Sequence, residues 1–496
     1  MTQPNILWIC TDQQRWDTIS ALGFAGVRTP NIDALTETGT AFSQAYCQSP
    51  ICTPSRASFL TGMYPSATQV QRNGNDHFPP HLTLIPRVFQ KAGYRTGLIG
   101  KLHLSAAQRR AETRPAEDGY DEFYWSQYPY PETGAPDDAK VAHDYHNWLT
   151  EKGVDVEAAF AFASEALAEG MPTEHHQTTW AGERAKRFVT DHRDQPWFLS
   201  INLFDPHPPF DPPAEYMARV DPETVPMPLW QDSDAAHFDR FRGVDMQTTN
   251  PVDPRIKPED GKAFSIPEGR ESHDTPPDSY DARRIKAAYF AMIELIDDMV
   301  GDLMATLRET GQERDTLILF MSDHGEMLGD HGLLYKGCRF YEGLVHVPML
   351  ISWPEKTEPG VSDALVELVD IPATLCDAAG LDVPYQNQGQ SLWPLLTGAV
   401  PRDRHKDRVL SEFWDAISFP GSIGSRGTMY FDGRYKLALY HDAREGEIYD
   451  LHSDPDEFDD LWSKPEHADL RQRLVERHFA EMMAVTGIGP ERVAAF

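Results

Sequence analysis

The chain has 496 residues, of which 40% are hydrophobic, so it can bury the core of one large and one smaller domain. Its 77 acidic residues outnumber 45 basic residues and give a formal net charge of -32. This negative charge argues against nucleic acid or an anionic membrane surface as the main partner. A local cluster of basic side chains would therefore stand out against the rest of the chain.

The N-terminal stretch MTQPNILWICTDQQ has no basic segment, and its apolar run NILWIC is shorter than a signal peptide or a membrane span requires. The five cysteines are odd in number and scattered, which fits a reducing compartment better than a disulfide framework. We therefore expect a cytoplasmic protein without a membrane partner. Within it, Cys10 and Cys376 are expected to be small buried hydrophobic residues.

Short apolar runs along the chain predict buried parallel strands of an α/β sheet. They are Asn5 to Cys10, Arg95 to Ile99, Pro196 to Leu203 and Thr316 to Met321, with a further central strand at Val347 to Trp353. Helical patterns such as Ile285 to Leu307 separate them. Two segments rich in proline and acids, Ala106 to Asn147 and Asp211 to Pro277, are expected to wall a pocket or to meet another subunit.

From about Pro401 the pattern changes to short strands, as in Tyr435 to Tyr440 and Gly446 to Leu451, and then to a helix from Ala468 to Met483. We expect a first domain over residues 1–400 and a smaller α+β unit over 401–496. The final helix carries Leu470, Leu474, Phe479 and Met482, which we expect to pack on their own domain. Contact with another subunit of a homo-oligomer is the alternative.

Polar residues follow the predicted strands where each one ends: Thr11-Asp12-Gln13, Gly100-Lys101-Leu102-His103, Asp205-Pro206-His207 and Ser322-Asp323-His324-Gly325. Because ligands of open α/β sheets bind beyond the carboxyl ends of the strands, we expect these residues to form one site. The simpler alternative is that Asp12 and Gln13 form a turn and that Asp323 caps a helix.

Asp12, Asp323 and His324 offer oxygen and nitrogen ligands for one divalent ion, and Gln13 adds a carbonyl oxygen. The same site would be lined by four residues that carry positive charge or a proton: Lys101, His103, His207 and Lys336. They could hold an anionic ester and protonate its leaving oxygen. Each residue alone has a simpler explanation, such as a solvated lysine or a histidine that orders a turn. Together, in so acidic a chain, they favour a catalytic site.

The segment CTPSRASFLTG, from Cys52 to Gly62, places a thiol at the start of a predicted helix. Unpaired backbone N–H groups and the helix dipole at such a position attract an anion and lower the pKa of a thiol. Cys52 is therefore a candidate nucleophile.

These residues strongly resemble the type I sulfatases of the alkaline phosphatase superfamily. The segment from Cys52 to Gly62 matches the CxPSRxxxLTG signature, in which a formylglycine-generating enzyme oxidises the cysteine to Cα-formylglycine. The stretches GKLHL, SDHGEMLGDHGLLYKG and EIYDLHSDPDE extend the resemblance over nearly the whole chain. It implies a large, mixed, mostly parallel sheet sandwiched by helices, with a smaller C-terminal α+β domain. The implied activity is the hydrolysis of sulfate monoesters, as in arylsulfatases.

The resemblance also implies roles for individual residues. Asp12, Gln13, Asp323 and His324 would bind the metal together with the modified Cys52, whose hydrated aldehyde supplies a hydroxyl group as the nucleophile. Arg56 would steady this hydrate. His207 or Lys336 would assist the leaving alcohol, and His103, beside Lys101, would take the proton of the second hydroxyl group. Asn73, Lys101, His207 and Lys336 would contact the substrate.

The metal-binding residues depart from the pattern of many sulfatases, which have two acids at the first strand and Asp-Asn at the later one. Here Asp12-Gln13 and Asp323-His324 remove a carboxylate and add an imidazole. This exchange favours Mn²⁺ over Ca²⁺, which stays the alternative.

The same two pairs, together with Asn73, resemble the phosphonate monoester hydrolases, which also act on phosphodiesters and use formylglycine. Lys101 and His103 argue for sulfate monoesters instead, with phosphonate and phosphodiester hydrolysis as side activities. A third alternative is a non-catalytic protein that binds sulfate esters and keeps Cys52 as a thiol.

Overall fold

A computed structural model describes residues 3–24, 26–106, 114–127, 129–131, 142–160, 167, 170–241, 244, 251–256, 280–414, 424–487, 489 and 493–494. Its centre is an eight-stranded sheet with the order β5-β4-β6-β1-β7-β8-β2-β9. The strands are β1 (Asn5–Thr11), β2 (Gly39–Phe42), β4 (Arg95–Gly100), β5 (Glu122–Trp125), β6 (Trp197–Asn202), β7 (Thr316–Ser322), β8 (Met349–Ser352) and β9 (Gly360–Ser362). From β5 to β7 neighbouring strands run parallel, whereas β8 is antiparallel to β7 and β2. The prediction of a mixed, mostly parallel sheet is confirmed.

Strand β1 lies at the middle of this sheet and is buried on both faces. Its residue Leu7 pairs with Leu199 of β6 on one side and with Ile318 of β7 on the other. The middle of a strand in this position, here Ile6 to Cys10, is apolar on both faces because each face meets a hydrophobic layer. This burial explains why the apolar runs of β1, β4, β6 and β7 were visible in the sequence.

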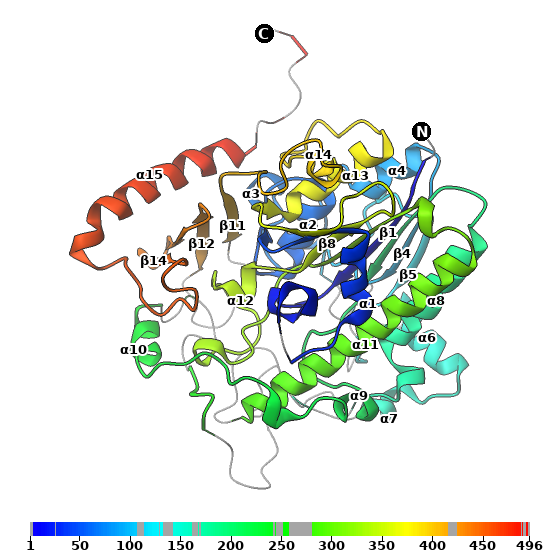
Figure 1. The fold of residues 1–496 in the computed structure, drawn as a ribbon, viewed down its shortest axis with the longest axis horizontal. Helices are drawn as coiled ribbons and strands as arrows, with labels where there is room; N and C mark the ends of the chain where they lie inside the picture. The colour runs from blue at the N-terminus through cyan, green and yellow to red at the C-terminus, as the bar shows by residue number, and fades with distance from the viewer. Residues whose placement is uncertain are drawn as a thin grey trace.

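Helices cover both faces of the sheet, as Figure 1 shows. One face packs against α2 (Cys52–Thr61), α4 (Ile85–Lys91) and α13 (Ile371–Ala379). The other packs against α6 (Asp144–Glu151), α8 (Gln177–Asp191) and α11 (Ala282–Glu309), which is the long helix predicted at 285–307. The shorter helices are α1 (Pro30–Asp33), α3 (Pro65–Thr68), α7 (Val156–Ala159), α9 (Ala214–Met217), α10 (Asp234–Phe238), α12 (Glu342–Val345) and α14 (Trp393–Leu396).

The C-terminal part is a four-stranded antiparallel sheet, β11-β12-β13-β14, followed by helix α15 (Ala468–Val485). Its strands are β11 (Val409–Trp414), β12 (Arg426–Phe431), β13 (Tyr435–Tyr440) and β14 (Glu445–Asp450). Helix α15 packs on this sheet through Leu474, with Leu470 and Met482 partly buried beside it (Figure 1). The prediction is wrong for Phe479, which points away from the sheet and is 68% exposed. The boundary at residue 400 stays a prediction.

The two segments rich in proline and acids fall partly outside the described residues. In the first, β5 extends the edge of the main sheet beside β4. In the second, His237 of α10 lies 2.7 Å from a carboxylate oxygen of Glu447 on β14. The second segment therefore reaches the C-terminal sheet. Among the described helices, none offers the long apolar stretch that a bilayer crossing needs.

A buried ion cluster joins the C-terminal part to a separate two-stranded sheet, β10-β3, and to the start of α13. The Nζ atom of Lys406 lies 2.6 Å from Glu367 Oε2 and 2.5 Å from Asp370 Oδ1. Glu367 ends the short strand β10 (Val366–Glu367), which pairs with β3 (Ala45–Tyr46), and Asp370 directly precedes α13. Arg408, just before β11, adds a second cation 3.3 Å from Glu367 Oε2. Because both carboxylates are fully buried, their negative charges destabilise the folded protein unless these cations compensate for them.

We expect Lys406→Met to lower the free energy of unfolding by about 3 to 5 kcal/mol, because it leaves buried carboxylates short of positive charge. The control is Lys186→Met, which removes a lysine 2.9 Å from Asp302 at the surface. That exposed pair is expected to contribute less than about 1 kcal/mol. Equilibrium urea unfolding followed by circular dichroism measures both values. An equal decrease in the free energy of unfolding in both variants would contradict a role of Lys406 in holding the buried carboxylates.

Candidate active site

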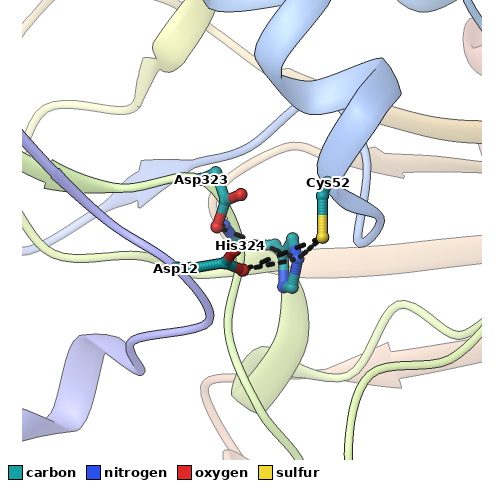
Figure 2. A group of neighbouring side chains, drawn as sticks. All are labelled: Asp12, Cys52, Asp323 and His324. Carbon is teal, nitrogen blue, oxygen red and sulfur yellow. Dashed lines mark hydrogen bonds and ion pairs between the residues drawn. The ribbon is translucent and has the colours of Figure 1, made fainter. Parts of the chain in front are cut away.

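The loops that follow β1, β4, β6 and β7 meet at one edge of the sheet, because these strands are neighbours and run parallel. Figure 2 shows the centre of this meeting point. There, one ligand atom from each of Asp12, Cys52, Asp323 and His324 lies within 4.8 Å of all the others, and all four residues are buried. The residues after β1 and β7 therefore lie together with the first residue of α2, and their role as one functional site stays a prediction.

Helix α2 brings Cys52 to this cluster as its first residue. The backbone N–H of Thr53 donates a hydrogen bond of 3.1 Å to Asn73 Oδ1, so Asn73 caps the first turn. Ser55 Oγ donates a bond of 2.6 Å to the backbone carbonyl of Asp323. Arg56 lies one turn after Cys52, on the same face of the helix. The signature segment thus delivers a thiol and a guanidinium to the ends of β1 and β7.

The distances within the cluster suit a metal ion. Cys52 Sγ is 3.1 Å from His324 Nε2, and His324 Nε2 is 3.8 Å from an oxygen of each aspartate. Arg56 Nη2 lies 2.9 Å from Asp323 Oδ2 and 3.6 Å from Asp12 Oδ2. Two carboxylates and an imidazole form a mixed oxygen and nitrogen set, which fits a divalent transition ion.

Gln13 lies beside the cluster and supports it. Its backbone adopts the left-handed conformation, with φ of 72°, and its N–H donates to Asp323 Oδ1 at 3.1 Å. Its backbone carbonyl accepts a hydrogen bond of 2.7 Å from the Tyr289 hydroxyl. Its side-chain oxygen accepts a bond of 3.1 Å from Lys336 Nζ. A role for Gln13 as a metal ligand stays a prediction.

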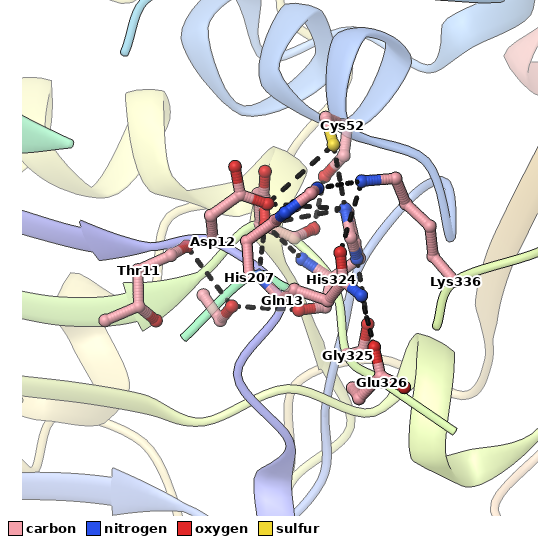
Figure 3. A network of polar contacts seen from close by, with 12 residues as sticks. Thr11, Asp12, Gln13, Cys52, His207, His324, Gly325, Glu326 and Lys336 are labelled. Atoms are coloured by element: carbon pink, nitrogen blue, oxygen red, sulfur yellow. Dashed lines mark hydrogen bonds and ion pairs between the residues drawn. The ribbon is translucent and has the colours of Figure 1, made fainter. Parts of the chain in front are cut away.

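The predicted cations and proton carriers surround the cluster, and Figure 3 shows two of them with their partners. Lys336 Nζ lies 2.8 Å from His207 Nε2. Lys101 Nζ forms an ion pair with Asp12 Oδ2. His103, in the same loop as Lys101, also has the left-handed conformation, with φ of 53°. A strained backbone at a histidine is uncommon and often marks a functional position.

The electrostatics of the site favour an ionised thiol. Burial and then the charge of Asp12 raise the pKa of Cys52, but Lys101 and further neighbouring cations lower it more, to about 7. Burial alone would also raise the pKa of Asp12. Lys101, followed by His207, nevertheless holds this pKa well below its usual range.

The pKa of His103 is lowered as well. Burial, and then the charge of Lys101, lowers the pKa of His103 well below its usual value. Its imidazole is therefore neutral at neutral pH. A neutral imidazole has an unprotonated nitrogen that can accept a proton, while the lowered pKa makes it a weaker base than a free histidine.

The structure adds residues to which the sequence interpretation gave no role. Glu326 is buried and accepts hydrogen bonds from the Gln13 side-chain amide and from the backbone N–H of Leu328 and Tyr335. Its signal was present in the motif SDHGE, where an acid follows the two predicted ligands. The Phe204 ring, 4.5 Å from the His207 ring, had no comparable signal because apolar residues are common after buried strands.

The chain was also compared with known proteins. Residues 4–381 match the family model described as Sulfatase, and residues 329–483 match the model described as N-sulphoglucosamine sulphohydrolase, C-terminal. The chain belongs to the sulfatase family. The fold and the strand-end cluster agree with this membership, so the resemblance drawn from the signature segment is confirmed.

Named relatives agree with the family. An arylsulfatase of Clostridium perfringens is 30% identical, and the match covers 96% of this chain and 94% of the relative. A choline-sulfatase of Rhizobium meliloti is 29% identical over 93% of this chain and 83% of the relative. The solved phosphonate monoester hydrolase of Silicibacter pomeroyi superposes with a TM-score of 0.79 at 26% identity, covering 97% and 96% of the two chains. This sulfatase is a sulfuric ester hydrolase with an alkaline phosphatase-like fold.

We expect Glu326→Gln to lower kcat/KM for 4-nitrophenyl sulfate by about 10- to 100-fold, because residues that orient metal-site loops have effects of this size. The substitution replaces the acceptor that holds Gln13. The control is Glu294→Gln, a buried glutamate of α11 that lies 3.9 Å from Arg219. It should keep a kcat/KM close to that of the wild type. Equal kcat/KM values for the two variants would argue against a positioning role for Glu326.

Proposed function

We propose that this sulfatase hydrolyses sulfate monoesters of the arylsulfatase type through a formylglycine made from Cys52 and one divalent metal ion. The main support is the position of Cys52, with Sγ 3.1 Å from His324 Nε2 and 3.8 Å from Asp12 Oδ1. A protein that only binds sulfate esters would not need a nucleophile position among metal ligands. Once formed by a formylglycine-generating enzyme, the hydrated aldehyde would supply a hydroxyl group that attacks sulfur.

Asp12, Asp323 and His324 would hold the metal, which would supply positive charge to the sulfate oxygens and to the nucleophile. Arg56 contacts both aspartates. It therefore offsets part of their charge and holds their carboxylates in place. Mn²⁺ is the favoured ion because the donor set contains an imidazole, and Ca²⁺ stays the alternative.

The other predicted residues of the site transfer the protons and bind the ester. His207 Nε2 and Lys336 Nζ, 2.8 Å apart, form one donor pair that can protonate the leaving alcohol. His103, whose imidazole is neutral, can take the proton of the second hydroxyl group of the hydrate. Lys101 and Asn73 would contact the sulfate oxygens from the loops beside α2.

Hydrolysis of phosphonate monoesters and phosphodiesters is the second candidate. It is favoured by the similarity to the phosphonate monoester hydrolase of Silicibacter pomeroyi and by the Asp-Gln and Asp-His pairs at the metal site. Lys101 and His103 instead favour sulfate esters, and Lys101 contacts the predicted ligand Asp12. We propose sulfate monoesters as the main substrates and the phosphorus esters as side substrates.

The test combines the mass of the Cys52 peptide with a comparison of substrates. In protein co-expressed with a formylglycine-generating enzyme, the peptide mass is expected to match formylglycine. The kcat/KM for 4-nitrophenyl sulfate should exceed the values for a phosphonate monoester and a phosphodiester. Cys52→Ala should lower it by at least about 10³-fold, as the loss of a nucleophile does. An unmodified, fully active thiol would overturn the formylglycine, and a higher phosphonate rate would reverse the order of substrates.

We expect a chelator to abolish turnover and Mn²⁺ to restore it further than Ca²⁺ at equal concentration. Asp323→Asn should reduce the bound metal measured by mass spectrometry after dialysis, because it removes a charged ligand. Asp297→Asn is the control, since Asp297 is a buried aspartate of α11 that accepts hydrogen bonds from Asn31 and Ile32 instead. Full activity in the metal-free protein would contradict the proposal.

A further inference from the structure

The turn that follows β1 is bound by a buried hydroxyl group from a distant helix. The Tyr289 hydroxyl donates a hydrogen bond of 2.7 Å to the backbone carbonyl of Gln13 and accepts one of 2.8 Å from the backbone N–H of Arg15. Tyr289 lies on α11 and is fully buried. One side chain thus binds two backbone groups of the turn that carries Asp12 and Gln13.

The backbone of Gln13 needs such support. Gln13 has the left-handed conformation, with φ of 72°, which residues other than glycine, asparagine and aspartate rarely adopt. A conformation of this kind persists only where the surrounding contacts hold it. The Tyr289 hydroxyl is one of these contacts, because it fixes the carbonyl on the C-terminal side of Gln13. A hydroxyl can donate and accept at the same time, whereas a phenylalanine ring can do neither.

The other polar groups of Gln13 reach the loop that follows β7. Its backbone N–H donates a bond of 3.1 Å to Asp323 Oδ1, and its side-chain amide donates to the carboxylate of Glu326. Figure 3 shows the side chains of Gln13 and Glu326 next to each other. A change of the Gln13 backbone would turn its N–H away from Asp323. The orientation of this carboxylate, a predicted metal ligand, therefore depends on the turn.

Arg15 forms a second link between the same two loops. Its Nη1 atom donates a bond of 2.8 Å to the backbone carbonyl of Glu326 and lies 2.8 Å from Asp330 Oδ2. Its backbone N–H is the group that donates to the Tyr289 hydroxyl. The loops after β1 and β7 are therefore joined at Gln13 and at Arg15, and Tyr289 holds both of these residues.

The ring of Tyr289 is fixed by packing that does not involve its hydroxyl. The Phe210 ring lies edge-on to it, with 6.0 Å between the ring centres. Both rings belong to the buried apolar cluster around α11. The substitution Tyr289→Phe therefore removes the two hydrogen bonds and keeps the packing of the ring.

We propose that Tyr289 is a positioning residue of the metal site, whose hydroxyl group holds the Gln13 turn in the conformation that orients Asp323 as a ligand. The inference rests on the divalent metal ion of the proposed function. Tyr289 would contact neither the ester nor the nucleophile, and it acts through Gln13. The affinity for the ion, rather than the chemical step, should therefore depend on this hydroxyl.

The test compares the apparent Kd for Mn²⁺ of Tyr289→Phe with that of the wild type, on protein whose Cys52 conversion is known. The free ion is followed by its electron paramagnetic resonance signal. We expect the Kd to rise by at least about tenfold, the lower end of the loss seen when residues that orient metal ligands are replaced. With Mn²⁺ in excess of this Kd, kcat/KM for 4-nitrophenyl sulfate should return close to the wild-type value.

The matched control is Tyr145→Phe. Tyr145 is also fully buried, and its hydroxyl donates a bond of 2.7 Å to a backbone carbonyl, that of His175. The control removes a bond of the same kind outside the metal site, so its Kd should equal that of the wild type. Circular dichroism spectra and melting curves verify the folding of both variants. Calorimetric titration with Ca²⁺ makes the same comparison for the alternative ion.

Two results would overturn the inference. One is the same Kd in Tyr289→Phe as in the wild type, and the other is an equal rise of the Kd in Tyr145→Phe. In both cases the wild type still binds the ion, so the proposed function is unaffected. A fully converted wild type that binds neither Mn²⁺ nor Ca²⁺ would instead overturn the metal ion of the proposed function and the inference together.

Discussion

The site depends on the close approach of two buried carboxylates, Asp12 at the end of β1 and Asp323 at the end of β7. These strands are hydrogen-bonded neighbours, so their last residues cannot move apart. Two negative charges held together away from water are unstable unless cations compensate for them. Arg56 supplies such charge from α2 and Lys101 supplies it from the loop after β4, and a metal ion would supply more. The need to compensate these two negative charges therefore explains why α2, the strand ends and the cations meet here.

The main sheet and the C-terminal part contribute different features to the structure. The reacting centre is built from strand ends of the main sheet and the first turn of α2, which are rigid and buried. A separate cavity takes one wall from the C-terminal sheet, through Trp414 and Arg426, and the other from residues 69–75. The buried contact of Lys406 with Glu367 and Asp370 ties the two parts together. Such a tie holds the C-terminal sheet against α13 and the β10-β3 pair.

The central strands of the fold could be predicted because burial on both faces demands unbroken apolar runs. The short strands β2, β5 and β9 could not be predicted, because runs of three or four residues carry little pattern. The apolar spacing of α15 predicted that Phe479 is buried, but it is exposed. Spacing along a helix does not show how far the neighbouring sheet extends. Glu326 was missed for a related reason: an acid in a loop looks the same whether it is solvated or holds a buried amide.

The sequence by itself determined the family, the parallel core and the residue types of the centre, because a signature at fixed spacing and continuous apolar runs are local properties. It also placed Asp12, Asp323 and His324 at strand ends, which follows from the same runs. Only the tertiary structure decided which side chains meet: the contact of Lys336 with His207, and the cavity between residues 69–72 and the C-terminal sheet. These contacts join residues far apart in the chain, and their distances depend on packing that no local pattern records.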